Sequence, residues 1–104
     1  MSQETPVARR QVEITNVYGL HLRPADKFVR LAAQFQSDIR VIHQGNRYNG
    51  KSILDLTTIA AECGTLLELE ASGPDAEEAV IALADLVLAQ FYETQEGHDK
   101  DPAP

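Results

Sequence analysis

The chain has 104 residues, of which 43% are hydrophobic and 24% charged, and its formal net charge is −7. This length and composition predict one folded domain with a single core rather than a disordered chain. The acidic balance argues against nonspecific binding to nucleic acid or to an anionic membrane. No apolar run approaches the ~20 residues of a membrane-spanning helix, and the first residues lack the hydrophobic segment of a signal peptide, so a cytoplasmic protein is expected.

The first half of the chain predicts a strand, a helix and a hairpin. Residues 10–15 alternate between apolar and polar side chains, which is typical of a strand with one solvated face. Apolar residues then recur at i, i+3, i+4 and i+7 over residues 24–35, the pattern of an amphipathic helix. Residues 38–44 alternate again, and residues 45–46 turn the chain into a short strand over residues 47–49.

A short capped helix is predicted next. Ser52 is a good N-cap, Asp55 stands at the capping-box position, and Gly64 is a suitable stop beyond the helix. Cys63 is the single cysteine, which excludes an internal disulfide and a cysteine-based zinc site. We expect it to be a small buried hydrophobe near the end of this helix.

The second half closes with a strand and the most strongly patterned helix. Residues 66–72 alternate as a strand, and residues 73–91 carry a helical stripe with Asp75 as its cap and Glu78 completing a capping box. Residues 93–104 have no periodicity, so we expect a disordered tail without functional residues.

These elements predict one α/β domain over residues 7–92, in the order β-α-β-β-α-β-α. Because the strands alternate between apolar and polar positions, the helices should cover one face of a sheet and leave the polar strand positions on the other. The predicted architecture is an open-faced sandwich.

The stretch Gly-Leu-His-Leu-Arg-Pro-Ala, residues 19–25, lies where the first strand passes into the first helix. A helix start offers unpaired N–H groups and the positive end of the dipole, which attract an anion such as phosphate. Arg23 adds forked donors for phosphate oxygens, and Pro24 is tolerated in a first turn and stiffens it. His21 is a nucleophile toward phosphorus when its ring is neutral. These ingredients predict a transferable phosphoryl group on His21.

Other interpretations of His21 stay open at this point. A histidine before a helix is often a plain cap, and it can also be a buried core residue or a metal ligand. The metal interpretation is weakest because His43 and His98 have no partners at ligand spacing. No glycine-rich loop indicates a nucleotide site, and no catalytic triad can be assembled from spacing.

Three separated segments, residues 15–35, 48–64 and 69–87, resemble in order the HPr family of histidine-containing phosphocarrier proteins. This family belongs to the bacterial phosphoenolpyruvate-dependent sugar phosphotransferase system. The resemblance implies a four-stranded antiparallel sheet of order 1-4-2-3 with three helices on one face. It also implies a stoichiometric phosphoryl carrier rather than an enzyme, acting as a monomer and requiring no cofactor or metal.

Site roles follow from the same resemblance. Enzyme I would phosphorylate Nδ1 of His21, and the group would pass to A-type domains of enzyme II. Arg23 would bind the phosphoryl oxygens, while Pro24 and the helix start hold the geometry. Ser52 would be a regulatory site for an HPr kinase/phosphorylase, although Asp55 stands where the family usually has glycine and would oppose the added charge.

The resemblance also implies an apolar partner-binding patch between the starts of the first two helices. Its residues here would be Leu22, Ile53 and Leu54, with Leu56 belonging to the core instead. Lys27 and Lys51 would supply positive charge around His21, although Lys27 can equally be a solvated surface residue. The alternative function is a regulatory interaction module that signals metabolic status through Ser52 or through partner binding, without sugar transport.

Overall fold

The computed structural model describes residues 5–93 and contains the predicted order of elements. The elements are β1 (Val7–Glu13), α1 (Leu22–Ala32), β2 (Asp38–His43), β3 (Asn46–Asn49), α2 (Ile53–Ile59), β4 (Leu66–Ser72), α3 (Ala76–Leu88) and a single 3₁₀ turn, η1 (Gln90–Tyr92). The strands form one antiparallel sheet in the order β1-β4-β2-β3. The predicted fold class is therefore confirmed.

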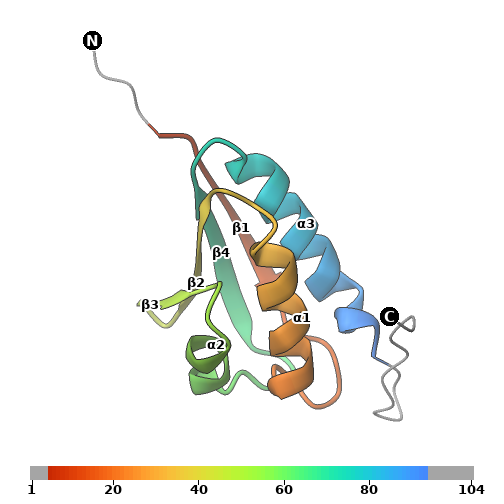
Figure 1. Ribbon diagram of the computed structural model, residues 1–104. Coiled ribbons are helices and arrows are strands. Elements are labelled where there is room, and N and C mark those ends of the chain that lie inside the picture. Colours follow the sequence, from red (N-terminus) through yellow and green to blue (C-terminus); the bar gives the residue numbers. More distant parts are fainter. Residues whose placement is uncertain (1–4, 94–104) are drawn as a thin grey trace.

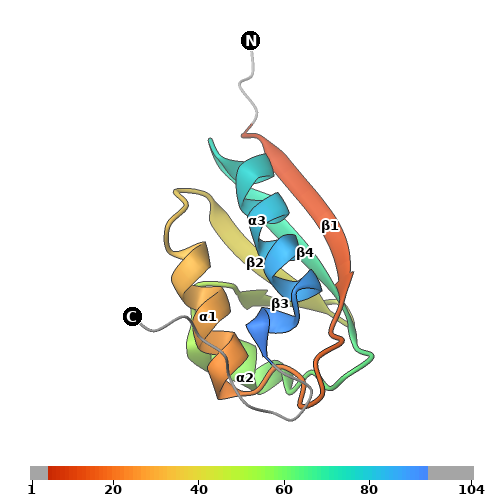
Figure 2. The same cartoon turned by 90° about the vertical axis from the view of Figure 1, so that its right-hand side faces the viewer.

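The molecule has a sheet layer and a helix layer (Figure 1). Helices α1 and α3 lie side by side over one face of the sheet, and the short helix α2 packs below them, close to the start of α1 (Figures 1 and 2). This arrangement brings the loop after β1, the start of α1 and the region that follows α3 to the same end of the molecule (Figure 2). No helix within residues 5–93 is long and apolar enough to cross a bilayer.

Strand β4 illustrates why the sheet has two different faces. Leu67, Leu69 and Ala71 are all buried and point toward the helices, as the alternation predicts. Glu70 points to the opposite face, where Arg9 Nε donates to it at 2.9 Å and Arg47 also binds its carboxylate. These ion pairs compensate a carboxylate whose residue is only 6% exposed.

Strand β1 and helix α1 both begin and end a few residues earlier than predicted, and two further element ends also differ from the prediction. Helix α2 ends at Ile59 because Ala60 adopts a left-handed conformation (φ 54°), with its N–H donating to the Thr57 carbonyl. Gly64 therefore does not stop the helix. The turn between β2 and β3 lies one residue earlier than predicted. His43 pairs with Asn46, so Gln44 and Gly45 are the two turn residues, and both have positive φ.

Two side-chain predictions are wrong as well. Cys63 is exposed, because it lies in the loop after α2 rather than under a helix end. Asp75 precedes α3 but makes no cap hydrogen bond, so the predicted capping box with Glu78 does not form. Its carboxylate instead accepts hydrogen bonds from Gln36 N at 2.9 Å and from Ser37 Oγ at 2.6 Å. Asp75 thus joins α3 to the α1–β2 connection.

Candidate functional site

A tight loop between β1 and α1 presents His21. The Gly19 N–H donates to the Asn16 carbonyl at 3.1 Å, and the buried Asn16 side chain returns a hydrogen bond from Nδ2 to the Gly19 carbonyl at 2.7 Å. Gly19 has φ +72°, and a Cβ there would lie 2.3 Å from the Ala61 carbonyl oxygen. Leu20 is buried and its N–H donates to that same oxygen at 2.8 Å. The backbone before His21 is thereby held on both sides.

His21 is the N-cap residue of α1, but its side chain does not act as a cap. The backbone is extended (φ −82°, ψ −171°), its carbonyl accepts the Ala25 N–H at 3.0 Å, and the imidazole makes no cap hydrogen bond. The side chain is 39% exposed, and Tyr18 packs edge-on against the ring with centroids 6.3 Å apart. The core and cap interpretations therefore do not describe this ring, which stands accessible at a helix start.

One edge of the imidazole is shielded by Glu93. Nε2 of His21 lies 2.9 Å from Oε2 of Glu93, whose side chain is only 4% exposed. The distance suits an ion pair, but Nε2 has no aligned hydrogen-bond partner among the described residues. The other carboxylate oxygen accepts from Asn16 Nδ2 at 2.9 Å. The sequence predicts Glu93 to lie in the tail, because it follows the last periodic segment and is 77 positions from Asn16, so no local pattern signals this contact.

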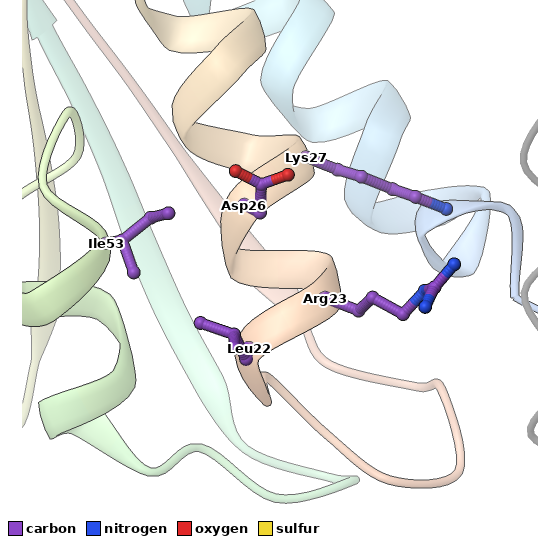
Figure 3. Close-up of a pocket in the computed structure, with 5 residues that line it drawn as sticks. All are labelled: Leu22, Arg23, Asp26, Lys27 and Ile53. Carbon is purple, nitrogen blue, oxygen red and sulfur yellow. The ribbon is translucent and has the colours of Figure 1, made fainter. Parts of the chain in front are cut away.

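Arg23, Pro24 and Lys27 follow His21 in the first two turns of α1. Pro24 is fully buried in the first turn, whereas Arg23 is exposed. Figure 3 shows Arg23 and Lys27 extending together toward the segment that follows α3. Lys27 Nζ donates to the Phe91 carbonyl at 2.7 Å, so this half-buried lysine is anchored rather than simply solvated.

A groove of about 410 Å³ runs between α1 and α2. Leu22 and Ile53 lie on its facing sides (Figure 3), and its lining consists of Leu22, Arg23, Asp26, Lys27 and Ile53. Leu22 is 64% and Leu54 75% exposed, which confirms that they are surface residues. Leu56 is fully buried, which confirms its predicted place in the core.

Ser52 begins α2 as predicted, with its Oγ accepting the Asp55 N–H at 3.2 Å. In a complete capping box the Asp55 carboxylate would accept the Ser52 N–H. Here it accepts the Asn49 N–H at 2.9 Å instead, and the Ser52 N–H donates to the Asn49 carbonyl. Asp55 therefore ties α2 to the end of β3.

Lys51 is not brought to His21. Its Nζ donates at 2.7 Å to the carbonyl of Phe35, which follows the C-terminal end of α1. An 11-residue helix is roughly 16 Å long, so this charge lies at the opposite end of α1 from the imidazole. Within residues 5–93, no three His, Cys, Asp or Glu side chains group in a way that could hold a metal ion.

Known proteins resemble this chain over most of its length. The family model described as PTS HPr component phosphorylation site matches residues 8–89. The phosphocarrier protein HPr of Neisseria meningitidis strain MC58 is 45% identical over 85 residues, which are 82% of this chain and 96% of that protein. The crystal structure of HPr-C-His from Thermoanaerobacter tengcongensis has a TM-score of 0.80 at 39% identity, covering 84% of this chain and 98% of that chain.

A further solved relative is Crh of Bacillus subtilis, a catabolite repression protein whose crystal structure is a domain-swapped, intertwined dimer. It has a TM-score of 0.66 at 37% identity and covers 86% of this chain and 97% of that chain.

Proposed function

This chain belongs to the HPr family of phosphocarrier proteins, and on that basis we propose that it accepts a phosphoryl group from enzyme I on His21. The group then passes to A-type domains of enzyme II in phosphoenolpyruvate-dependent sugar uptake. The chain acts as a cytoplasmic monomer and as a stoichiometric carrier, without a cofactor of its own. The observation that carries the proposal is an accessible imidazole at the start of α1 that makes no cap hydrogen bond.

The start of α1 supplies the groups that a phosphoryl anion needs. The first-turn N–H groups of Leu22 and Arg23 have no acceptor within the helix, and the helix dipole is positive at this end. Pro24 has no N–H, so its burial in this turn leaves no donor unsatisfied. The Arg23 guanidinium, two residues after His21 in the chain, carries fixed positive charge and forked donors. Together these groups stabilise the negative charge that gathers on the phosphoryl oxygens during transfer.

Partners would dock on the apolar surface beside His21. Leu22 and Leu54 are exposed, and Ile53 lines the groove between α1 and α2. Lys27 adds positive charge on the same side of α1 as His21, where it favours an acidic partner face. Lys51 would contribute its charge near the start of α2 rather than at the ring.

Regulation at Ser52 is the second part of the proposal. Ser52 is half-buried at the start of α2, beside the groove residue Ile53, so a phosphate of about −2 charge there would alter the partner surface. The Ser52 Oγ already accepts the hydrogen bond that caps α2, so an HPr kinase/phosphorylase would add the phosphate to the oxygen that forms the cap. Asp55 accepts from Asn49 in the same turn and opposes a second negative charge.

Transfer is tested by incubating the full chain with enzyme I and phosphoenolpyruvate and mapping the phosphate by mass spectrometry under alkaline conditions. We expect one acid-labile phosphate on His21, with subsequent transfer to an A-type domain. Phosphate on another residue, or no phosphate with an active enzyme I control, would contradict the carrier function.

The regulatory module is the second candidate, and the likeness to Crh favours it. It predicts that the chain takes no phosphate from enzyme I but binds a partner in a manner that depends on Ser52. Because a pure regulator has no need of a nucleophilic histidine, an intact His21 with adjacent Arg23 supports the carrier instead.

A further inference from the structure

The segment after α3 has an unusual backbone. Gln90, Phe91 and Tyr92 all have positive φ, at 55°, 54° and 62°. The left-handed region disfavours residues with a Cβ, so three in succession persist only where other contacts compensate. This turn leads directly into Glu93, whose backbone is extended.

Three contacts hold the turn in place. The Phe91 side chain is fully buried, and the Phe91 carbonyl accepts from Lys27 Nζ at 2.7 Å. Gln90 Nε2 lies 3.3 Å from Thr15 Oγ1, next to the loop that presents His21. Because these contacts anchor the strained turn to both α1 and this loop, they fix the position of the Glu93 side chain that follows.

The Glu93 carboxylate is enclosed between two groups of the site. Oε1 accepts from Asn16 Nδ2 at 2.9 Å, and Oε2 lies 2.9 Å from His21 Nε2. Both Asn16 and the Glu93 side chain are almost fully shielded from solvent, so water cannot replace these partners. Asn16 Nδ2 also donates to Gly19 and is therefore fixed relative to the loop.

We propose that Glu93 is a positioning residue for phosphoryl transfer, which holds the His21 imidazole with its proton on Nε2 and its lone pair on Nδ1. A carboxylate only accepts hydrogen bonds, so it favours the tautomer that carries the proton on the facing nitrogen. This inference rests on the proposed carrier function of His21. The contact between Nε2 and Oε2 would align into a hydrogen bond when the partner closes over the site.

With the proton on Nε2, phosphoryl transfer to Nδ1 needs no proton to be added or removed. The Nδ1 lone pair forms the new P–N bond as the bond from phosphorus to the donor group of enzyme I breaks and its electron pair returns to that group, and the Nε2 proton stays where it is. The ring becomes a positively charged phosphoimidazolium, and the negative Glu93 carboxylate faces that charge at Nε2. Transfer onward to an A-type domain reverses the same changes in the ring.

A test that needs no phosphoryl donor measures the tautomer directly. In the full chain with ¹⁵N-labelled histidine, we expect the NMR shifts of neutral His21 to report the Nε2–H form. Glu93→Gln keeps the shape but presents an amide that can donate as well as accept, so the Nδ1–H form should become populated. Glu13→Gln removes an exposed carboxylate from β1 and is the matched control, with a wild-type spectrum for His21.

The same variants are then phosphorylated by enzyme I. Glu93→Gln should lower kcat/KM for this chain as substrate about tenfold, which is about 1.4 kcal/mol, while Glu13→Gln stays at the wild-type rate. A wild-type tautomer in Glu93→Gln, with or without slower transfer, would overturn the positioning role. An altered tautomer with unchanged transfer would overturn its importance for the reaction. If the wild-type chain takes no phosphate on His21, the carrier function fails, whereas the tautomer measurement still decides whether Glu93 orients the ring.

Discussion

The first residues of α1 and α2, Leu22 and Ile53, line the same groove, but the two helices use their first-turn N–H groups differently. At α2, Ser52 Oγ accepts the Asp55 N–H, so the helix satisfies one of its own unpaired donors. At α1, the His21 side chain accepts nothing from the first turn and its ring remains accessible. A capped start stabilises its helix, whereas an uncapped start beside an arginine leaves its donors for a ligand. The comparison separates a helix start whose donor is capped from one whose donors we propose to bind the phosphoryl group.

The largest expected effect is at the uncapped start. His21→Ala should abolish labelling by enzyme I and phosphoenolpyruvate, because the nucleophile is removed. The chain should still fold, since the ring caps nothing, but the free energy of unfolding should fall by roughly 1–3 kcal/mol because the shielded Glu93 carboxylate loses the partner that faces it. Labelling assays and urea titration measure the two quantities. If His21→Ala were still labelled at the wild-type rate, the phosphate would be on another residue, and the contrast between the two helix starts would be lost.

Arg23→Ala should slow phosphoryl transfer about a hundredfold, because forked donors stabilise charge on the phosphoryl group during transfer. Stability should change little, since an exposed arginine contributes little to the free energy of unfolding even where it forms an ion pair. Arg30→Ala is the matched control: Arg30 lies on the same helix and pairs only with Asp26 in the usual i, i+4 manner among the contacts described. Equal transfer rates in the two variants would make Arg23 an ordinary surface charge.

At the capped start, charge and capping can be separated. Ser52→Asp keeps an acceptor at the N-cap but adds a negative charge near the partner surface, so transfer from enzyme I should fall about tenfold with little loss of stability. Ser52→Ala should do the reverse, lowering the free energy of unfolding by about 1 kcal/mol while leaving transfer unchanged. Single-turnover phosphorylation and urea titration of both variants give the result. Slow transfer in Ser52→Ala would show that the cap itself shapes the partner surface.

The start of α3 gives a smaller effect that depends on pH. The Ser37 hydroxyl, followed by the Gln36 N–H, lowers the pKa of Asp75 from its ordinary 3.8. A carboxylate with a lowered pKa contributes stability above its unfolded pKa and loses it as pH falls through the folded value. Asp75→Asn should therefore be less stable than wild type at pH 7, and the difference should shrink below pH 3.8.

Urea titrations at several pH values test this prediction, with Asp85→Asn as the control because it removes an exposed carboxylate from the same helix. A difference for Asp75→Asn that persists unchanged at low pH would mean that its hydrogen bonds do not depend on the charge.

The sequence alone determined the features that depend on neighbours within about four positions. The period-two pattern identified β4 over Leu66–Ser72 with the observed bounds, because alternation is a property of the strand itself. The Ser52 cap was likewise predictable, since its acceptor and the Asp55 donor are three residues apart. The placement of His21 before a helix followed from the local sequence around Arg23 and Pro24.

Only the tertiary structure decided which side chains meet across the fold. Asp75 has the local pattern of a cap, yet it binds Gln36 and Ser37, because the packing of α3 beside the α1–β2 connection offers it better donors. Glu93 reaches His21 only because the buried Phe91 and the left-handed turn bring the chain back over the start of α1. Such contacts join residues tens of positions apart, so their energies depend on the packed fold and leave no periodic trace in the sequence.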